Sequence, residues 1–454
     1  MKHIALALAS ATAIGGATSA FAADATPTFS RDVAPILYNN CVVCHRPGEV
    51  APMSLLTYQN ARPWARAIKN KVVNHEMPPW GAGPGSMKLA NDRSLARKDI
   101  ETIVRWADGG APKGEDKDLP AAPVFPDGGW AFGKPDAVIE LPIEAQVAPT
   151  GEIPQLSYFV KSPFPNDVWM QAMQIRTSNP AIVHHGTLFI RTLPDDVVIK
   201  DGRPVIAEGQ GSTQGNTEGG VNTLPAGSGP GVRLVSYVPG RGWERYADGV
   251  ARRLPAGAYI EFNMHYQASG KPERERAQFG IWLSRVPVKY EMQNVSSLDR
   301  GTTMVEGRPL AGNERVPNIP PGVDNWKISN FKIFPEPATL YAMSPHMHLR
   351  GKDMKFIVTY PDGREEVVLD VPKYDFNWQL YYELATPLKL PAGSKLTAIS
   401  HYDNSAKNKW NPAPDREVFW SEQSWDEMYN PQIRWTWDLQ DLTKTTPPPA
   451  GSQQ

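Results

Sequence analysis

Five consecutive residues near the start of the chain carry the clearest chemistry. Cys41 and Cys44 are the only cysteines, and His45 follows the second of them, which gives a C-x-x-C-H sequence. Two thiols at this spacing can each add to a vinyl group of haem, and the adjacent imidazole can then bind the iron. A redox-active C-x-x-C lacks its βαβ context here, and a zinc site lacks a second cysteine pair. The motif therefore predicts one covalently bound haem c, with His45 as the proximal iron ligand.

The second axial ligand of this haem is expected in the segment His75–Trp80. This segment resembles the Met-Pro-Pro loop of class I c-type cytochromes, in which the methionine is the distal ligand. The resemblance implies that Met77 binds the iron. His75 is the rival ligand, because it lies two residues away, and Met53 and Met87 are weaker alternatives.

Histidines form a second pattern far from the haem motif. Nine histidines occur in the chain, and five of them fall in three compact places, namely His184-His185, His265 and the pair His346 and His348. On a strand, His346 and His348 point to the same face, which suits chelation, whereas His184 and His185 reach one metal only if the strand bulges or the rings use different nitrogens. Imidazole ligands with a thioether nearby favour copper, and zinc also fits the imidazoles alone.

His265 lies on a predicted strand, Tyr259–Tyr266, in which apolar and polar residues alternate. His265 shares its face with Glu261 and Asn263, opposite the apolar residues. We therefore expect His265 at a polar surface rather than in the core.

Five short motifs resemble, in type and order, those of the copper type II, ascorbate-dependent monooxygenases. They are Ile182–His185, Met264–Tyr266, Ile319–Gly322, His346–Leu349 and Glu427-Met428. The family contains peptidylglycine α-hydroxylating monooxygenase and dopamine β-monooxygenase. The resemblance covers about residues 136–445 and is strong around the motifs.

The resemblance implies two copper ions, each with three protein ligands. The electron-storing copper would be held by His184, His185 and His265. The catalytic, oxygen-binding copper would be held by His346, His348 and Met428. In this family, two jelly-roll sandwiches face each other across a solvent cleft and carry one copper each. His401 matches no ligand of the family.

The implied function is hydroxylation of a C–H bond of a small organic substrate with O2. Each turnover needs two electrons, which the family takes from ascorbate. A haem in the same chain favours delivery through that haem from a periplasmic electron donor. A non-enzymatic haem and copper protein, for electron transfer or copper handling, would use the same ligands. A hydrolase is disfavoured, because the chain has no G-x-S-x-G and no H-E-x-x-H sequence.

The substrate site departs from the family pattern. The peptide-amidating enzymes bind a glycine carboxylate with an arginine and a tyrosine, where this chain has Ser344 and Gln432. Neither residue offers a bidentate cation or a phenol. A peptide with a C-terminal glycine is therefore disfavoured as substrate, and the region from residue 136 onward has no cysteine to form disulfides.

Periodicity predicts the elements that position these residues. Helical patterns cover Phe29–Asn40, Tyr58–Asn74 and Ser94–Asp108, and short β-rich runs separated by Pro and Gly follow from residue 137. We expect a small all-α class I cytochrome c domain followed by two antiparallel β-sandwich (jelly-roll) domains. The boundaries are a signal peptide at 1–22, a cytochrome c domain at 23–112, a linker at 113–135, sandwiches at 136–295 and 296–445, and a disordered tail at 446–454. The composition of Glu208–Gly231 is typical of a flexible loop.

The first residues predict export. Lys2 precedes the apolar stretch Ile4–Phe21, and Ala20-Phe21-Ala22 is a small-x-small cleavage site, so we expect a periplasmic protein. No later apolar run is long enough for stable membrane insertion. Without Lys2 the chain has 46 Lys and Arg against 48 Asp and Glu, a net charge of −2. This balance argues against a nucleic-acid partner.

Overall fold

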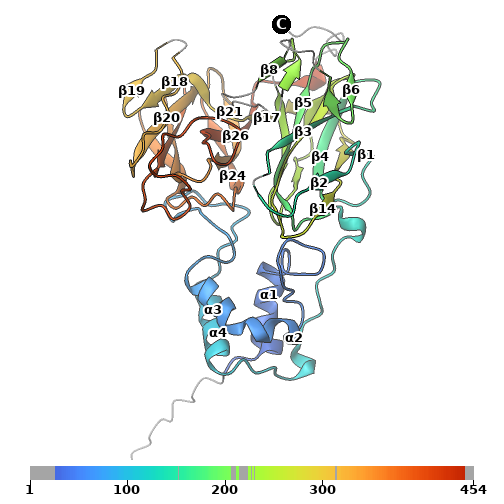
Figure 1. The fold of residues 1–454 in the computed structure, drawn as a ribbon, viewed down its shortest axis with the longest axis vertical. Coiled ribbons are helices and arrows are strands. Elements are labelled where there is room, and N and C mark those ends of the chain that lie inside the picture. The colour runs from blue at the N-terminus through green and yellow to red at the C-terminus, as the bar shows by residue number, and fades with distance from the viewer. Residues whose placement is uncertain are drawn as a thin grey trace, which may run out of the picture.

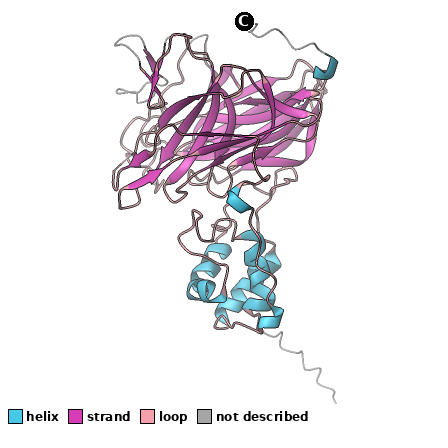
Figure 2. Ribbon diagram, turned by 90° about the vertical axis from the view of Figure 1, so that its right-hand side faces the viewer, coloured by secondary structure: helices cyan, strands magenta, loops and turns pink. Residues whose placement is uncertain are grey.

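The structure is a computed structural model that describes residues 26–151, 153–205, 211–213, 223–225, 227–229, 231–311 and 314–444. The expected signal peptide, the tail and most of the Glu208–Gly231 loop lie outside the described residues. Strands form two units side by side, and the helical segment lies below both of them (Figure 1). The turned view in Figure 2 shows the same separation of strands from helices. No helix among the described residues is long and apolar enough to span a membrane.

The helical segment consists of short elements around one small core. Its elements are a π-helix η1 (Phe29–Val33), α1 (Ala34–Asn40), α2 (Tyr58–Ala61), η2 (Arg62–Trp64), α3 (Ala65–Val73), α4 (Arg97–Asp108), η3 (Asp116–Asp118) and η4 (Asp127–Gly129). Thr28 caps the first helix by accepting a hydrogen bond from the Arg31 N–H. Ile103 and Trp106 of α4 are fully buried in this core, together with residues of α1 and α3.

The predicted fold class is wrong, because the described chain is mostly β and the helical segment is not an all-α domain of its own. Between α3 and α4 the chain leaves the helices and pairs with the second β unit. The Met87 N–H donates to the Val368 carbonyl at 3.1 Å and the Ala90 N–H to the Glu383 carbonyl at 2.7 Å. Leu89 belongs to the core of that unit. The helical periodicity reported local structure correctly but carried no information on this long-range pairing.

The first β unit contains two main sheets. Its strands are β1 (Ala137–Glu140), β2 (Ala145–Val147), β3 (Leu156–Lys161), β4 (Val168–Arg176), β5 (Val183–Arg191), β6 (Ile199–Lys200), β7 (Arg203–Pro204), β8 (Gly211–Thr213), β9 (Thr223–Pro225), β10 (Val232–Tyr237), β11 (Trp243–Arg245), β12 (Val250–Leu254), β13 (Tyr259–Tyr266), β14 (Glu273–Glu275), β15 (Gln278–Leu283) and β16 (Tyr290–Glu291). One sheet has the order β1-β15-β4-β12-β16, with β11 beside β4, and the other has the order β10-β5-β13-β3. β12 and β16 are parallel, so the unit is not purely antiparallel.

The second β unit repeats the arrangement with a four-stranded and a six-stranded sheet. Its strands are β17 (Gln293–Val295), β18 (Asp299–Val305), β19 (Arg308–Pro309), β20 (Trp326–Ile333), β21 (Ala338–His346), β22 (Gly351–Thr359), β23 (Glu365–Val371), β24 (Tyr382–Leu390), β25 (Lys395–Tyr402) and β26 (Asn430–Trp437), followed by η5 (Leu442–Lys444). The sheet orders are β17-β26-β21-β24 and β19-β18-β20-β25-β22-β23.

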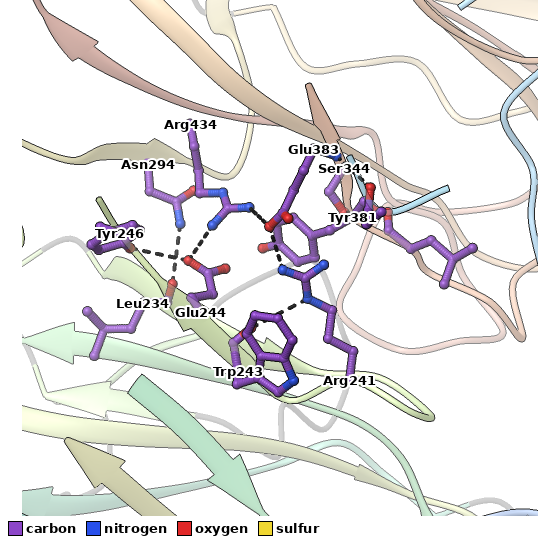
Figure 3. A network of polar contacts seen from close by, with 12 residues as sticks. Leu234, Arg241, Trp243, Glu244, Tyr246, Asn294, Ser344, Tyr381, Glu383 and Arg434 are labelled. Atoms are coloured by element: carbon purple, nitrogen blue, oxygen red, sulfur yellow. Dashed lines mark hydrogen bonds and ion pairs between the residues drawn. The ribbon is translucent and has the colours of Figure 1, made fainter. Parts of the chain in front are cut away.

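The two β units meet through polar faces, and buried ion pairs join them (Figure 3). Arg434 of β26 donates to Glu244 of β11 at 2.7 Å and to Glu383 of β24 at 3.1 Å, and Arg241 also pairs with Glu383. Although burial favours its protonated form, the guanidinium groups of Arg241 and Arg434 hold the pKa of Glu383 below its ordinary value. Glu383 therefore stays ionised, and the network fixes the two units relative to each other.

Candidate metal centre

A β-bulge brings three histidines together in the first β unit. On β5 and β13, His265 lies opposite His185, but Tyr266 lies opposite Val183, so His184 is an extra residue on β5. Such a bulge cancels the alternation that would otherwise send adjacent side chains to opposite faces. The ligand atoms of His184, His185 and His265 all lie within 4.8 Å of one another.

The three rings converge through the same kind of nitrogen. Nδ1 of His184 lies 3.2 Å from Nδ1 of His185 and 3.4 Å from Nδ1 of His265. A neutral imidazole carries one proton, so His184 Nδ1 cannot donate to both neighbours. Nitrogens 3.2 Å and 3.4 Å apart are near enough for one metal ion to bind both members of each pair at the usual metal–nitrogen distance of about 2.0–2.1 Å. The donor set and its spacing therefore fit a metal ion.

Burial keeps these imidazoles in their metal-binding form. Loss of hydration lowers the pKa of His184 to about 4 and the pKa of His265 to about 3, and it lowers the pKa of His185 well below its ordinary value. The neutral imidazole is the form that binds metals. The polar face of β13 is more buried than the sequence predicted, although His265 itself is half-buried. Arg191 of the first unit pairs with Glu261, and Ser424 of the second unit contacts His265. Asn263 is 5% exposed and Glu261 is 3% exposed.

The second set of ligands lies at the facing edge of the second β unit. His346 ends β21, and its Nε2 lies 3.3 Å from the Met428 sulfur. The other nitrogen of His346, Nδ1, contacts Oε1 of Gln379 at 2.5 Å, and His348 Nδ1 contacts the Asp426 carbonyl at 3.1 Å. These contacts fix the ring orientations and leave Nε2 of both histidines for a metal.

A buried carboxylate organises the loops that carry this second set. Glu427 accepts hydrogen bonds from the N–H groups of His348 at 2.7 Å and Arg350 at 2.6 Å. Burial raises the pKa of Glu427 to about 7. The Tyr402 hydroxyl donates to the Met428 carbonyl at 2.6 Å. The sequence motif Glu427-Met428 was noted only for its methionine, and nothing in it identified Gln379 or Tyr402.

The two sets of ligands lie next to each other. The ring centroids of His185 and His346 are 6.2 Å apart, and Ser424 Oγ of the second unit lies 3.3 Å from His265 Nε2. Phe376 packs on His184 at 4.8 Å and on His348 at 5.6 Å between centroids. The family resemblance implied a solvent cleft between the two coppers, whereas the rings of His185 and His346 lie close to each other across the two units.

A pocket opens beside both sets of ligands. It is a small cavity of about 80 Å³ whose mouth opens to solvent. His185, His346 and Met428 line it together with polar side chains, among them Arg233 and Gln432. A small organic molecule in this pocket would lie against ligands of both sets.

The Cys41–His45 motif, here called the haem motif after its predicted ligand, also has features that would fit a haem. The Cys41 and Cys44 thiols are free and half-buried, and burial raises the pKa of Cys41 to about 12. His45 Nδ1 lies 3.2 Å from the Met53 carbonyl, a contact that orients the ring and leaves Nε2 for iron. These residues would hold a haem through two thioether bonds and one axial nitrogen.

The remaining candidate ligands lie in different surroundings. Met77 is half-buried and His75 is exposed, with a φ of 55°. Met87 packs against the core of the second β unit, away from the helical core. His401 Nδ1 pairs with Asp353 on the neighbouring strand at 2.7 Å, so its contact is structural.

Comparisons with known proteins give no assignment. No protein-family model matches the chain, and no curated protein matches it significantly. An uncharacterized protein from Listeria monocytogenes EGD-e, solved with glucose, magnesium and calcium, has 13% identity and a TM-score of 0.16, over 42% of this chain and 14% of that protein. A Paenibacillus xanthan lyase has 9% identity and a TM-score of 0.18, over 73% of this chain and 29% of the lyase. A two-domain protein of unknown function from Bacteroides fragilis NCTC 9343 has 10% identity and a TM-score of 0.17, over 62% of this chain and 94% of that protein.

Proposed function

We propose that this chain is a periplasmic haem- and copper-dependent monooxygenase that hydroxylates a C–H bond of a small organic substrate with O2. The observation that carries the proposal is the meeting of two ligand sets at one pocket. The three converging imidazoles of His184, His185 and His265 lie beside His346 and its neighbours, with 6.2 Å between the rings of His185 and His346. The likeness of the motifs to the copper type II, ascorbate-dependent monooxygenases supports the same interpretation.

The residues of the chain would divide the work between the two sets. Copper at these ligands would supply one-electron chemistry and the activation of O2. His184, His185 and His265 would hold the ion that receives electrons, and their burial keeps them unprotonated. His346, His348 and Met428 would hold the ion next to the substrate. Glu427 and Gln379 position these ligands, and Phe376 excludes water from the space between the sets.

The position of the haem motif supports an electron supply from within the molecule. Gly240 lies at the tip of a hairpin closed by paired hydrogen bonds between Val238 and Arg241, and a Cβ on Gly240 would clash with Cys44 Sγ. Tyr237 of β10 pairs with Gly186 of β5, the residue after His185. The backbone path from Gly240 to Gly186 is about 15 Å at ~3.3 Å per residue and ~4.8 Å between strands. A haem on Cys44 would thus lie at the end of a strand pair that leads to the first ligand set.

This route predicts a specific kinetic defect. Gly240→Ala should push the haem-bearing loop away from the hairpin and slow electron transfer from reduced haem to Cu(II) several-fold, since tunnelling falls steeply with distance. The measurement is anaerobic stopped-flow, with haem reoxidation followed optically and Cu(II) by electron paramagnetic resonance. Gly249→Ala is the matched control, because Gly249 has the same φ of +79° but a Cβ added there would meet no atom within 4 Å. Equal slowing in both variants would reject the route.

The proposed function itself is tested on the complete protein, matured with haem in a periplasm. Elemental mass spectrometry should find two coppers for each haem iron, and an oxygen electrode should record substrate-dependent O2 uptake with ascorbate as reductant. Iron alone, even after copper reconstitution, would overturn the proposal. Two coppers without O2 uptake across a panel of C–H substrates would replace it with the non-enzymatic electron carrier.

A further inference from the structure

One arginine in the pocket has no partner for most of its donors. Arg233 of β10 is 3% exposed, and its Nη2 donates to Ser236 Oγ at 2.7 Å. Its Nε and Nη1 are buried and have no acceptor among the described residues. Buried donors of a charged group are costly to leave unpaired, so such a group calls for an anion.

A second bulge aims Arg233 into the pocket. On β10 and β5, Arg233 lies opposite Phe189 and Ser236 lies opposite Thr187, so three steps on β10 match two on β5. Without the extra residue, Arg233 and Ser236 would point to opposite faces. With it, both line the pocket, as do Phe189 and Thr187. His185 shares this face, since it precedes Thr187 and Phe189 at intervals of two residues.

No carboxylate forms an ion pair with this cation, although the nearby charge of Glu244 favours its protonated form and raises its pKa against the effect of burial. Three buried arginines, Arg233, Arg241 and Arg434, lie near two carboxylates, Glu244 and Glu383, and the ion pairs go to Arg241 and Arg434. Tyr381 lies under the guanidinium of Arg233 at 4.8 Å, which holds its plane without neutralising its charge. Among these five side chains, the positive charges exceed the negative charges by one.

One carboxylate lines the pocket. Glu422 is the only acidic residue among the described residues that line it, and this residue is half-buried and engaged in an interaction of its own. Arg233 lines the same pocket as His346 and Met428 of the second ligand set. An anion bound at Arg233 would therefore place the rest of its molecule against His346 and Met428.

We propose that Arg233 is the specificity residue of the pocket and that the substrate is a small organic acid whose carboxylate accepts a hydrogen bond from the guanidinium group of Arg233. This inference rests on the proposed function. The arginine comes from the first β unit, whereas Ser344 and Gln432, on the second unit, line the same pocket without charge. The sequence analysis looked for a carboxylate-binding arginine at Ser344 of β21, whereas the structure places the buried arginine, Arg233, on β10.

Calorimetric titration of the copper-loaded protein tests this inference with acetate, butyrate and benzoate, each against its neutral amide. At least one acid should bind about tenfold or more tightly than its amide, as expected for charge-assisted hydrogen bonds. Arg233→Gln should abolish that preference, and Arg233→Lys should retain part of it. Arg245→Gln is the matched control and should keep the full preference, because Arg245 of β11 is exposed.

Each outcome bears on one claim. No preference for any acid over its amide in the wild type, or a preference that survives Arg233→Gln, overturns the inference. If the acids bound to copper rather than to Arg233, their preference over the amides would survive Arg233→Gln. If Arg233→Gln does not fold, a preference that is unchanged in Arg233→Lys overturns the inference. Copper content is measured on the same samples, so a copper-loaded protein without the preference rejects only this inference. A protein that keeps the preference but cannot bind copper rejects only the proposed function.

Discussion

Replacing both His346 and His348 by alanine is expected to lower the copper content from two ions to one per haem iron and to reduce O2-dependent turnover more than about 100-fold. The loss should exceed the roughly 10- to 100-fold effect of removing residues that merely support metal ligands. The first ligand set should keep its copper, because the double variant leaves the bulge of β5 and its pairing with β13 untouched. Elemental analysis and an oxygen electrode measure the two effects.

The control for this variant is His401→Ala, which removes a half-buried histidine that pairs with Asp353 and contacts neither ligand set. It should retain both coppers and normal turnover. Gln379→Ala should give an intermediate result, since it removes the contact at His346 Nδ1 but leaves all ligands in place. Retention of two coppers in the double variant would show that these histidines do not hold a metal.

The second large effect is expected at the contact between the two β units. Arg434→Met would leave Glu244 and Glu383 without their shared guanidinium, and Glu244 is 2% exposed. Removing one partner of a buried ion pair costs about 3–5 kcal/mol, because the remaining charge is stripped of both water and partner. Urea unfolding should show this loss in the transition that separates the two units.

Arg308→Met provides the comparison for Arg434→Met. Arg308 pairs with Glu314 at the surface, where water compensates for the loss of the partner, so unfolding should be nearly unchanged. A loss in Arg434→Met no greater than that in Arg308→Met would mean that the interface network does not stabilise the fold. The network also bears on chemistry, since it holds the two ligand sets at their separation of 6.2 Å between rings.

This short separation changes how electrons would move between the two sets. In a site where solvent separates two metals, electrons must pass through water or through a bound substrate. Here Phe376 contacts rings of both sets, and Ser424 reaches from one unit to His265 of the other. β10 extends from the hairpin beside the haem motif and pairs with β5 next to His185. The ring of His185 in turn lies 6.2 Å from the ring of His346.

The sequence alone determined the local features. The helical pattern at Phe29–Asn40 is present as a π-helix followed by α1, and the alternating pattern at Tyr259–Tyr266 is present as β13. The ligand types at His184, His185 and the later histidines were also visible, because short spacings specify which side chains lie together within one element.

Only the tertiary structure decided which elements meet. Apolar periodicity reports a face that packs in a core, but a polar face that packs against another polar face has no such signature, so the burial of Glu261 and Asn263 was missed. Pairing of the chain near Met87 with the second β unit joins segments about 280 residues apart, which no local pattern encodes. For the same reason, the free donors of Arg233 beside both ligand sets became visible only once the two units were in place.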